Sequence, residues 1–108
     1  MRYLFWKEGI PKAELQYPVY DAAGQLIGNA DFAWPEYGVL GEFDGRVKYE
    51  QFLKEGERAS DAVVREKLRE DRMREATGWN FIRFVWADLN RPARTAERVR
   101  RVLHATRR

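Results

Sequence analysis

Polar and apolar residues alternate along three stretches in the first half of the chain, 14–20, 25–34 and 39–44. A period of two is typical of β-strands with one buried face. Residues 35–38, which read Pro-Glu-Tyr-Gly, separate the last two stretches. Proline fixes φ early in a turn and glycine accepts a positive φ at its end, so this connection predicts a hairpin. The pattern predicts three antiparallel strands joined in order.

The simplest register of the hairpin pairs Trp34 with Val39, and Asp31 then faces Glu42. Side chains alternate between the two faces of a strand. One face of the hairpin is therefore expected to be apolar and to hold Ala30, Phe32, Trp34, Val39 and Phe43. The other face is expected to hold Asp31, Ala33, Leu40, Glu42 and Asp44. Three of these five side chains are carboxylates.

The three carboxylates are candidate metal ligands. Opposed strand residues have Cβ atoms about 5 Å apart, so like charges there repel each other. Mg²⁺ or Mn²⁺ would remove this repulsion, because hard cations take carboxylate oxygens as ligands. Asp31, Glu42 and Asp44 therefore predict a metal site, and Lys48 can orient a water or stabilise charge in phosphodiester hydrolysis. The ordinary alternative is a strand end with acids beside a turn, since Asp44 is followed by a glycine.

The first strand adds two second-tier candidates. Glu14 and Gln16 share one face of stretch 14–20. They either touch the metal or phosphate, or form an exposed polar pair on an edge strand. Before them, residues 1–8 predict a short helix that Gly9 ends. This start also resembles the end of a longer helix, so we expect an upstream segment and a chain that is the C-terminal fragment of a longer one.

A longer helix is predicted over 60–77, with Ser60 as N-cap and Gly78 as the stop. Its apolar stripe is expected to consist of Val64, Leu68 and Ala76. Lys67 and Asp71 are four residues apart and share one side of the helix. They are either second-tier members of the site or a surface ion pair. A separate basic face, expected to be solvated, holds Arg65, Arg69 and Arg72.

The segments around this helix predict a connector, a buried strand and a last helix. Residues 50–59 are polar and predict a solvated connector rather than a lid. Stretch 79–87 is apolar on both faces, as expected for a strand covered on both sides. Trp79 and Trp86 are therefore expected in the core rather than stacked on bases. Pro92 suits the first turn of the last helix, whose apolar stripe is Ala96, Val99, Val102 and Leu103.

The last helix carries the candidate DNA-binding residues, Arg94, Arg98 and Arg101. An arginine-rich helix can follow a phosphate backbone. The alternatives are a disordered basic end or a surface for a protein partner. The single histidine, His104, is expected on the surface of this helix rather than as a ligand.

Composition bounds the remaining possibilities. With 108 residues, 44% of them hydrophobic, the chain predicts one domain over 1–108 with one small core. The absence of cysteine excludes disulfides and thiolate metal sites and is compatible with the cytoplasm. No apolar run reaches membrane-spanning length. The net charge of +3 favours polyanionic partners only mildly.

Several motifs resemble the restriction-endonuclease-like PD-(D/E)XK superfamily. An aspartate, about ten residues and then Glu-Phe-Asp-Gly match its acidic core. The stretch from Arg69-Glu70-Asp71-Arg72 to the Gly-Trp strand at 78–86 is similar to the very-short-patch-repair (Vsr-like) branch. Residues 11–89 also look like nuclease-like domains that follow a winged-helix segment in actinobacterial toxin–antitoxin-type proteins. The Vsr-like pattern has a histidine shortly after its acidic strand, where this chain has Lys48.

The resemblance and the element order α-β-β-β-α-β-α imply an α+β sandwich. Its mixed sheet would combine a three-stranded antiparallel meander with a crossover strand, flanked by helices. The resemblance implies a metal-dependent DNA endonuclease that uses Mg²⁺ or Mn²⁺. The alternative is a non-catalytic module of the same fold that binds nucleic acid or a protein in a toxin–antitoxin-type regulator. A third hypothesis is a structural domain that forms a homodimer through its aromatic surface.

Overall fold

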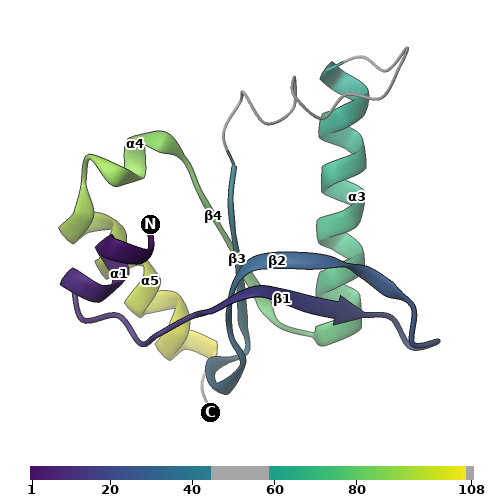
Figure 1. Ribbon diagram of the computed structural model, residues 1–108, viewed down its shortest axis with the longest axis horizontal. Coiled ribbons are helices and arrows are strands. Elements are labelled where there is room, and N and C mark those ends of the chain that lie inside the picture. Colours follow the sequence, from purple (N-terminus) through teal and green to yellow (C-terminus); the bar gives the residue numbers. More distant parts are fainter. Residues whose placement is uncertain (45–58, 107–108) are drawn as a thin grey trace.

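The protein is described by a computed structural model, which covers residues 1–44 and 59–106. It is an α+β domain built on a mixed four-stranded sheet in the order β1-β2-β3-β4. The strands are β1 (Glu14–Tyr20), β2 (Leu26–Trp34), β3 (Val39–Phe43) and β4 (Asn80–Phe84). The helices are α1 (Arg2–Lys7), α3 (Ala59–Thr77), α4 (Trp86–Leu89) and α5 (Pro92–Thr106). Helices α1 and α5 lie on one side of the sheet and α3 on the other (Figure 1).

The predicted meander and crossover are confirmed. Strands β1, β2 and β3 pair antiparallel, and Trp34 lies opposite Val39 in the predicted register. A single 3₁₀ turn, Pro35–Tyr37, joins β2 to β3, and Gly38 accepts a φ of 67°. Strand β4 follows α3 along the chain and pairs parallel with β3. The carboxyl ends of β3 and β4 therefore meet at the same edge of the sheet.

The α1–α5 side of the sheet carries an aromatic core. The Phe5 ring lies 5.2–5.5 Å from the rings of Phe32, Trp34 and Phe84. Helix α1 stops at Gly9, where a φ of 73° turns the chain so that the Ile10 amide donates to the Phe5 carbonyl. Aliphatic residues of α5 complete the cluster, and they include the predicted stripe, Ala96, Val99 and Leu103, with Val102 partly buried.

The α3 side has a smaller apolar core, formed by Val19, Ala30, Ala33, Leu40 and Met73. Here the predicted helix stripe is wrong. The side chains of Val64 and Leu68 are 58% and 59% exposed, and Ala76 is also exposed. The helix instead turns Met73 and the charged Arg69 and Glu70 towards the sheet. The reason is that β3 presents a carboxylate on this side, which requires a basic partner rather than an apolar one.

The predicted alternation along β2 fails at Asp31. Ala30 packs on the α3 side, yet Phe32, two residues later, packs on the α1–α5 side. Gln16 lies opposite Asp31 in β1 and has a φ of 50°, which is the left-handed region. At the point where β1 is distorted, the side chains of β2 change face. The prediction that Ala30 and Phe32 lie on the same face of the sheet is therefore wrong.

The strand predicted over 79–87 ends earlier, at Phe84. The Val85 amide donates to the Asp88 carboxylate at 2.8 Å, which starts the short helix α4. Trp79 is partly buried, as expected, but Trp86 is 61% exposed and the prediction of a core position was wrong. Helix α3 begins at Ala59, one residue before the predicted cap. No helix in the described part of the chain is long and apolar enough to cross a membrane.

Candidate functional site

The carboxyl end of β3 carries two of the predicted acids. Glu42 is the fourth residue of the strand and is only 2% exposed, and Asp44 directly follows the strand. The Asp44 amide donates to the Phe84 carbonyl at 2.6 Å, which continues the ladder to β4 by one residue. Both carboxylates lie on the α3 side, where they meet different arginines. The strand therefore presents two neighbouring carboxylates to the same side.

Glu42 is held by Arg69 of α3. The Arg69 Nη1 group donates to Glu42 Oε1, and its Nη2 group donates to the Asn29 carbonyl at 2.7 Å. Gly28 leaves room for this arginine, because a Cβ at that position would lie 2.7 Å from Arg69 Nε. A buried carboxylate is costly unless it is paired and hydrogen-bonded. The Arg69 contact meets that requirement.

Asp44 belongs to a second group of charges that centres on Arg83 of β4. Arg83 Nη1 donates to Asp44 Oδ2 at 2.9 Å, and Arg83 Nε donates to Glu70 Oε1 at 2.7 Å. Glu70 is buried and also pairs with Arg74 at 3.0 Å. Arg83 therefore connects Asp44, directly after β3, to Glu70 of α3.

Asp31 does not join these two acids. Its Oδ2 accepts from the Phe43 amide at 2.9 Å, and Gln16 Nε2 donates to its Oδ1 at 3.4 Å. Asp31 also lines a pocket together with Arg2 of α1 and Trp86. The Asp31 carboxylate thus takes the place of a backbone carbonyl as the hydrogen-bond acceptor for the Phe43 amide, where the β2–β3 ladder ends. Within residues 1–44 and 59–106, no three His, Cys, Asp or Glu side chains are grouped so that they could hold a metal ion.

The other candidate site residues lie at varying distances from this edge. Glu14 is exposed at the start of β1. Lys67 pairs with Asp71 at 3.5 Å and approaches Glu70 at 3.8 Å, so it touches the Arg83 group at its outer end. Lys48 and most of the predicted connector 50–59 lie outside the described residues.

The structure brings the three predicted DNA-binding arginines together. A hollow of 340 Å³ at the start of α5, which we call the arginine pocket, is lined by Arg91, Arg94, Arg98 and Arg101, with Ala87, Asp88 and Thr95. Arg98 Nη2 donates to the Arg83 carbonyl at 3.0 Å and to Asp88 Oδ2 at 3.2 Å. The arginine pocket is thus attached to β4 at the residue whose side chain binds Asp44.

Sequence reasoning missed Arg69, Glu70 and Arg83 as members of this site. It placed Arg69 on a solvated face and gave Arg83 no role in a strand expected to be buried on both faces. One signal was available, because a charged residue inside a buried strand needs a charged or polar partner. The identity of that partner depends on how α3 packs, which the local sequence does not specify.

Two uncharacterized proteins from two strains of Mycobacterium tuberculosis are similar to the chain. Each is 31% identical over 100 residues, which is 92% of this chain and 33% of the relative. The chain therefore spans about a third of the length of the curated relatives it matches. No family model and no solved structure matches the chain.

Proposed function

We propose that the chain is a metal-dependent DNA endonuclease domain with a restriction-endonuclease-like core. Its site is the edge of the sheet where β3 and β4 end. The observation that carries the proposal is the pair of carboxylates, Glu42 and Asp44, on one side of the end of β3. The arginine pocket of α5 is attached to the same edge through Arg83 and Arg98.

Glu42 and Asp44 fit a metal of the magnesium type. Mg²⁺ keeps several waters and is commonly held by one or two carboxylates together with substrate phosphates. Two acids at alternate positions of a strand offer that donor set without Asp31. When bound there, Mg²⁺ or Mn²⁺ would lower the pKa of a water and offset the charge of the phosphodiester. No third protein carboxylate is required for this role.

The residues of the chain have separate tasks in this proposal. Arg69 and Arg83 fix the carboxylates of Glu42 and Asp44 through hydrogen bonds, so both acids are oriented before substrate arrives. The arginines of the α5 pocket bind a neighbouring phosphate and hold the backbone in register. Lys48, four residues after Asp44, is the candidate to orient the attacking water.

The order of the elements supports the nuclease-type core. An antiparallel meander is followed by α3 and then by a strand parallel to β3, with further helices on the opposite side. This is the arrangement that the resemblance to the PD-(D/E)XK superfamily implies, and it puts the acidic strand beside the crossover strand. The support comes from topology, and the chemistry depends on the acids themselves.

The test is a nicking assay on supercoiled plasmid DNA with Mg²⁺ or Mn²⁺, run against EDTA. We expect nicked product with metal, none with EDTA, and a rate that falls about a hundredfold for Asp44→Asn. Glu36→Gln is the matched control, because Glu36 is an exposed acid in the turn at the opposite end of β3. Cleavage that survives EDTA, or that Asp44→Asn leaves unchanged, contradicts the proposal.

A non-catalytic nucleic-acid-binding module of the same fold is the second candidate. Two observations favour it: an arginine already pairs with each acid of β3, and Lys48 replaces the histidine of the Vsr-like pattern. A domain of this kind would serve a regulator of the toxin–antitoxin type. DNA binding by the wild type, with no cleavage under any metal condition in the plasmid assay, would select this candidate.

A further inference from the structure

Two aromatic side chains project from α1 into solvent. Tyr3 is 67% and Trp6 is 76% exposed, and their ring centroids lie 6.0 Å apart with a tilt of 38°. Both rings come from the outer face of the helix, whereas Leu4 and Phe5 of the same helix are buried. Burial in the core therefore does not account for Tyr3 and Trp6. Exposed aromatic residues grouped on one face often mark a binding surface.

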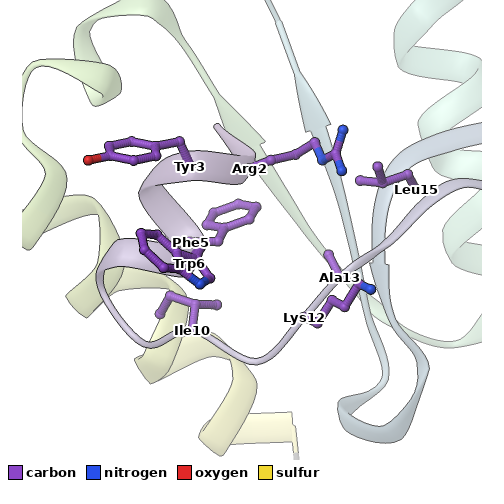
Figure 2. A pocket seen from close by; sticks show the side chains of 8 residues that line it. All are labelled: Arg2, Tyr3, Phe5, Trp6, Ile10, Lys12, Ala13 and Leu15. Atoms are coloured by element: carbon purple, nitrogen blue, oxygen red, sulfur yellow. The ribbon is translucent and has the colours of Figure 1, made fainter.

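A pocket of 550 Å³ lies beside these rings, between α1 and the start of β1 (Figure 2). It is lined by Arg2, Tyr3, Phe5, Trp6, Ile10, Lys12, Ala13 and Leu15. The two charged side chains in this lining, Arg2 and Lys12, are both basic. The surface thus combines aromatic faces with positive charge, which suits an anion that carries flat apolar groups.

This surface continues to the end of β3, on the side of the sheet opposite the Glu42 and Asp44 carboxylates. A second pocket, of 530 Å³, shares Arg2, Tyr3 and Leu15 with the first. It extends to Phe43, the residue before Asp44, and to the exposed Trp86, whose ring lies 4.8 Å from that of Phe43. Among the described residues that line it, Asp31 is the one acid, and Asp31 accepts hydrogen bonds from Gln16 and the Phe43 amide. Aromatic and basic groups therefore run from α1 to the edge where β3 ends.

We propose that Tyr3, Trp6 and Trp86 form a stacking surface for unpaired bases of single-stranded DNA. Aromatic side chains stack on any base, and basic residues follow the backbone, so such surfaces bind single strands with little sequence preference. A duplex hides its base faces, whereas a single strand exposes them. The inference deepens the proposed function and rests on it for one point, that the DNA strand passes around the edge where β3 ends to reach Glu42 and Asp44.

The charge of the surface argues against a second copy of this chain as the partner. A second copy of this chain, with its net charge of +3, would bring like charge to Arg2 and Lys12. A nucleic-acid backbone brings the opposite charge. Homodimer formation through these aromatic residues is therefore an outcome of the test rather than part of the proposal.

The test is binding of a fluorescein-labelled single strand, measured by anisotropy in EDTA so that no cleavage interferes. We expect Tyr3→Ala and Trp6→Ala each to weaken binding about tenfold. Trp6→Phe should keep most of the affinity, since phenylalanine also stacks. Tyr20→Ala is the matched control, because Tyr20 is exposed at the far end of β1. A duplex of the same sequence should respond much less to the α1 substitutions.

Three results would overturn the inference. They are a single strand that binds Trp6→Ala as tightly as wild type, an equal reduction in affinity for single strand and duplex, and a dimer in sedimentation that Trp6→Ala abolishes. Cleavage separates this inference from the proposed function. Loss of nicking with Asp44→Asn and unchanged binding by Trp6→Ala would remove the stacking surface alone. Normal single-strand binding without metal-dependent nicking would remove the endonuclease alone.

Discussion

The two faces of the sheet are covered by different kinds of buried side chain. On the α1–α5 side, Phe5, Phe32, Trp34 and Phe84 pack ring against ring, and α5 adds aliphatic residues. On the α3 side, the apolar cluster has fewer buried residues and none of them is aromatic, and the buried acids Glu42 and Glu70 are held by arginines. Helices α1 and α5 cover one side of the sheet and α3 the other (Figure 1), so the sheet separates an aromatic core from a smaller apolar core that also contains buried charges.

The difference indicates where stability and chemistry reside. Apolar burial stabilises a fold at about 25 cal/mol per Å² and needs no partner of particular geometry. Buried ion pairs contribute little net stability, since desolvation offsets the attraction. The two acids buried on one face therefore add little net stability, and buried charge is common at functional sites. Substitutions on the two faces can test this division.

The largest effect is expected on the aromatic face. Phe84→Ala removes a fully buried ring that packs on Phe5 and Phe32, and should lower the free energy of unfolding by about 3–5 kcal/mol. Urea unfolding followed by circular dichroism measures it. A decrease under about 1 kcal/mol would mean that this face is not the main core.

A smaller but still large effect is expected from Arg69→Met. It leaves the buried Glu42 carboxylate without this arginine, which should cost about 3 kcal/mol. Adding Glu42→Gln should recover most of that stability, because the buried negative charge is then gone as well. If the double variant is as unstable as the single one, Arg69 contributes through packing rather than through the ion pair.

Asp44→Asn should change the stability by less than about 1 kcal/mol. Asp44 is partly exposed, and Arg83 retains Glu70 as a partner when the aspartate is neutralised. Thermal unfolding of the variant beside wild type measures the change. A fall of several kcal/mol would make Asp44 structural and would confound its use in the nicking assay.

Replacing the exposed arginines of the arginine pocket should leave stability unchanged and alter only DNA binding. Replacing Arg91, Arg94 and Arg101 by glutamine removes positive charge that binds phosphate. The slope of log affinity against log salt should then fall by about one for each phosphate that is no longer neutralised. Arg98 is left in place because it also holds the Arg83 carbonyl and Asp88. An unchanged slope would exclude this pocket from the DNA interface.

The fold was largely predictable where the signals are local. The hairpin register follows from a proline–glycine turn and two apolar runs, and the parallel crossover follows from a helix between strands. The change of face at Asp31 was not predictable, because it depends on the positive φ of Gln16 in the neighbouring strand. The exposed position of Trp86 depends on a side-chain cap from Asp88, which ends the apolar stretch as a strand.

The acids of the proposed site were candidates from the sequence, and their arginine partners were not. Glu42 and Asp44 stand out as charges at the end of an apolar strand. Arg69 lies on a helix whose orientation was inferred from Val64 and Leu68, and both of these residues are exposed. Hydrophobic periodicity identifies the buried side of a helix only when that side is apolar. On the α3 side the partner surface is charged, so the inference selected the wrong side.

Isothermal titration calorimetry with Mn²⁺ tests whether Glu42 and Asp44 form the metal site. We expect wild type to bind one Mn²⁺, and we expect no such binding by Asp44→Asn or Glu42→Gln. Asp31→Asn should bind Mn²⁺ as wild type does. The Asp31 carboxylate is hydrogen-bonded to Phe43 and Gln16 and lines the pocket that Arg2 and Trp86 also line. Failure of Asp31→Asn to bind Mn²⁺, or full binding with Asp44→Asn, would contradict the account.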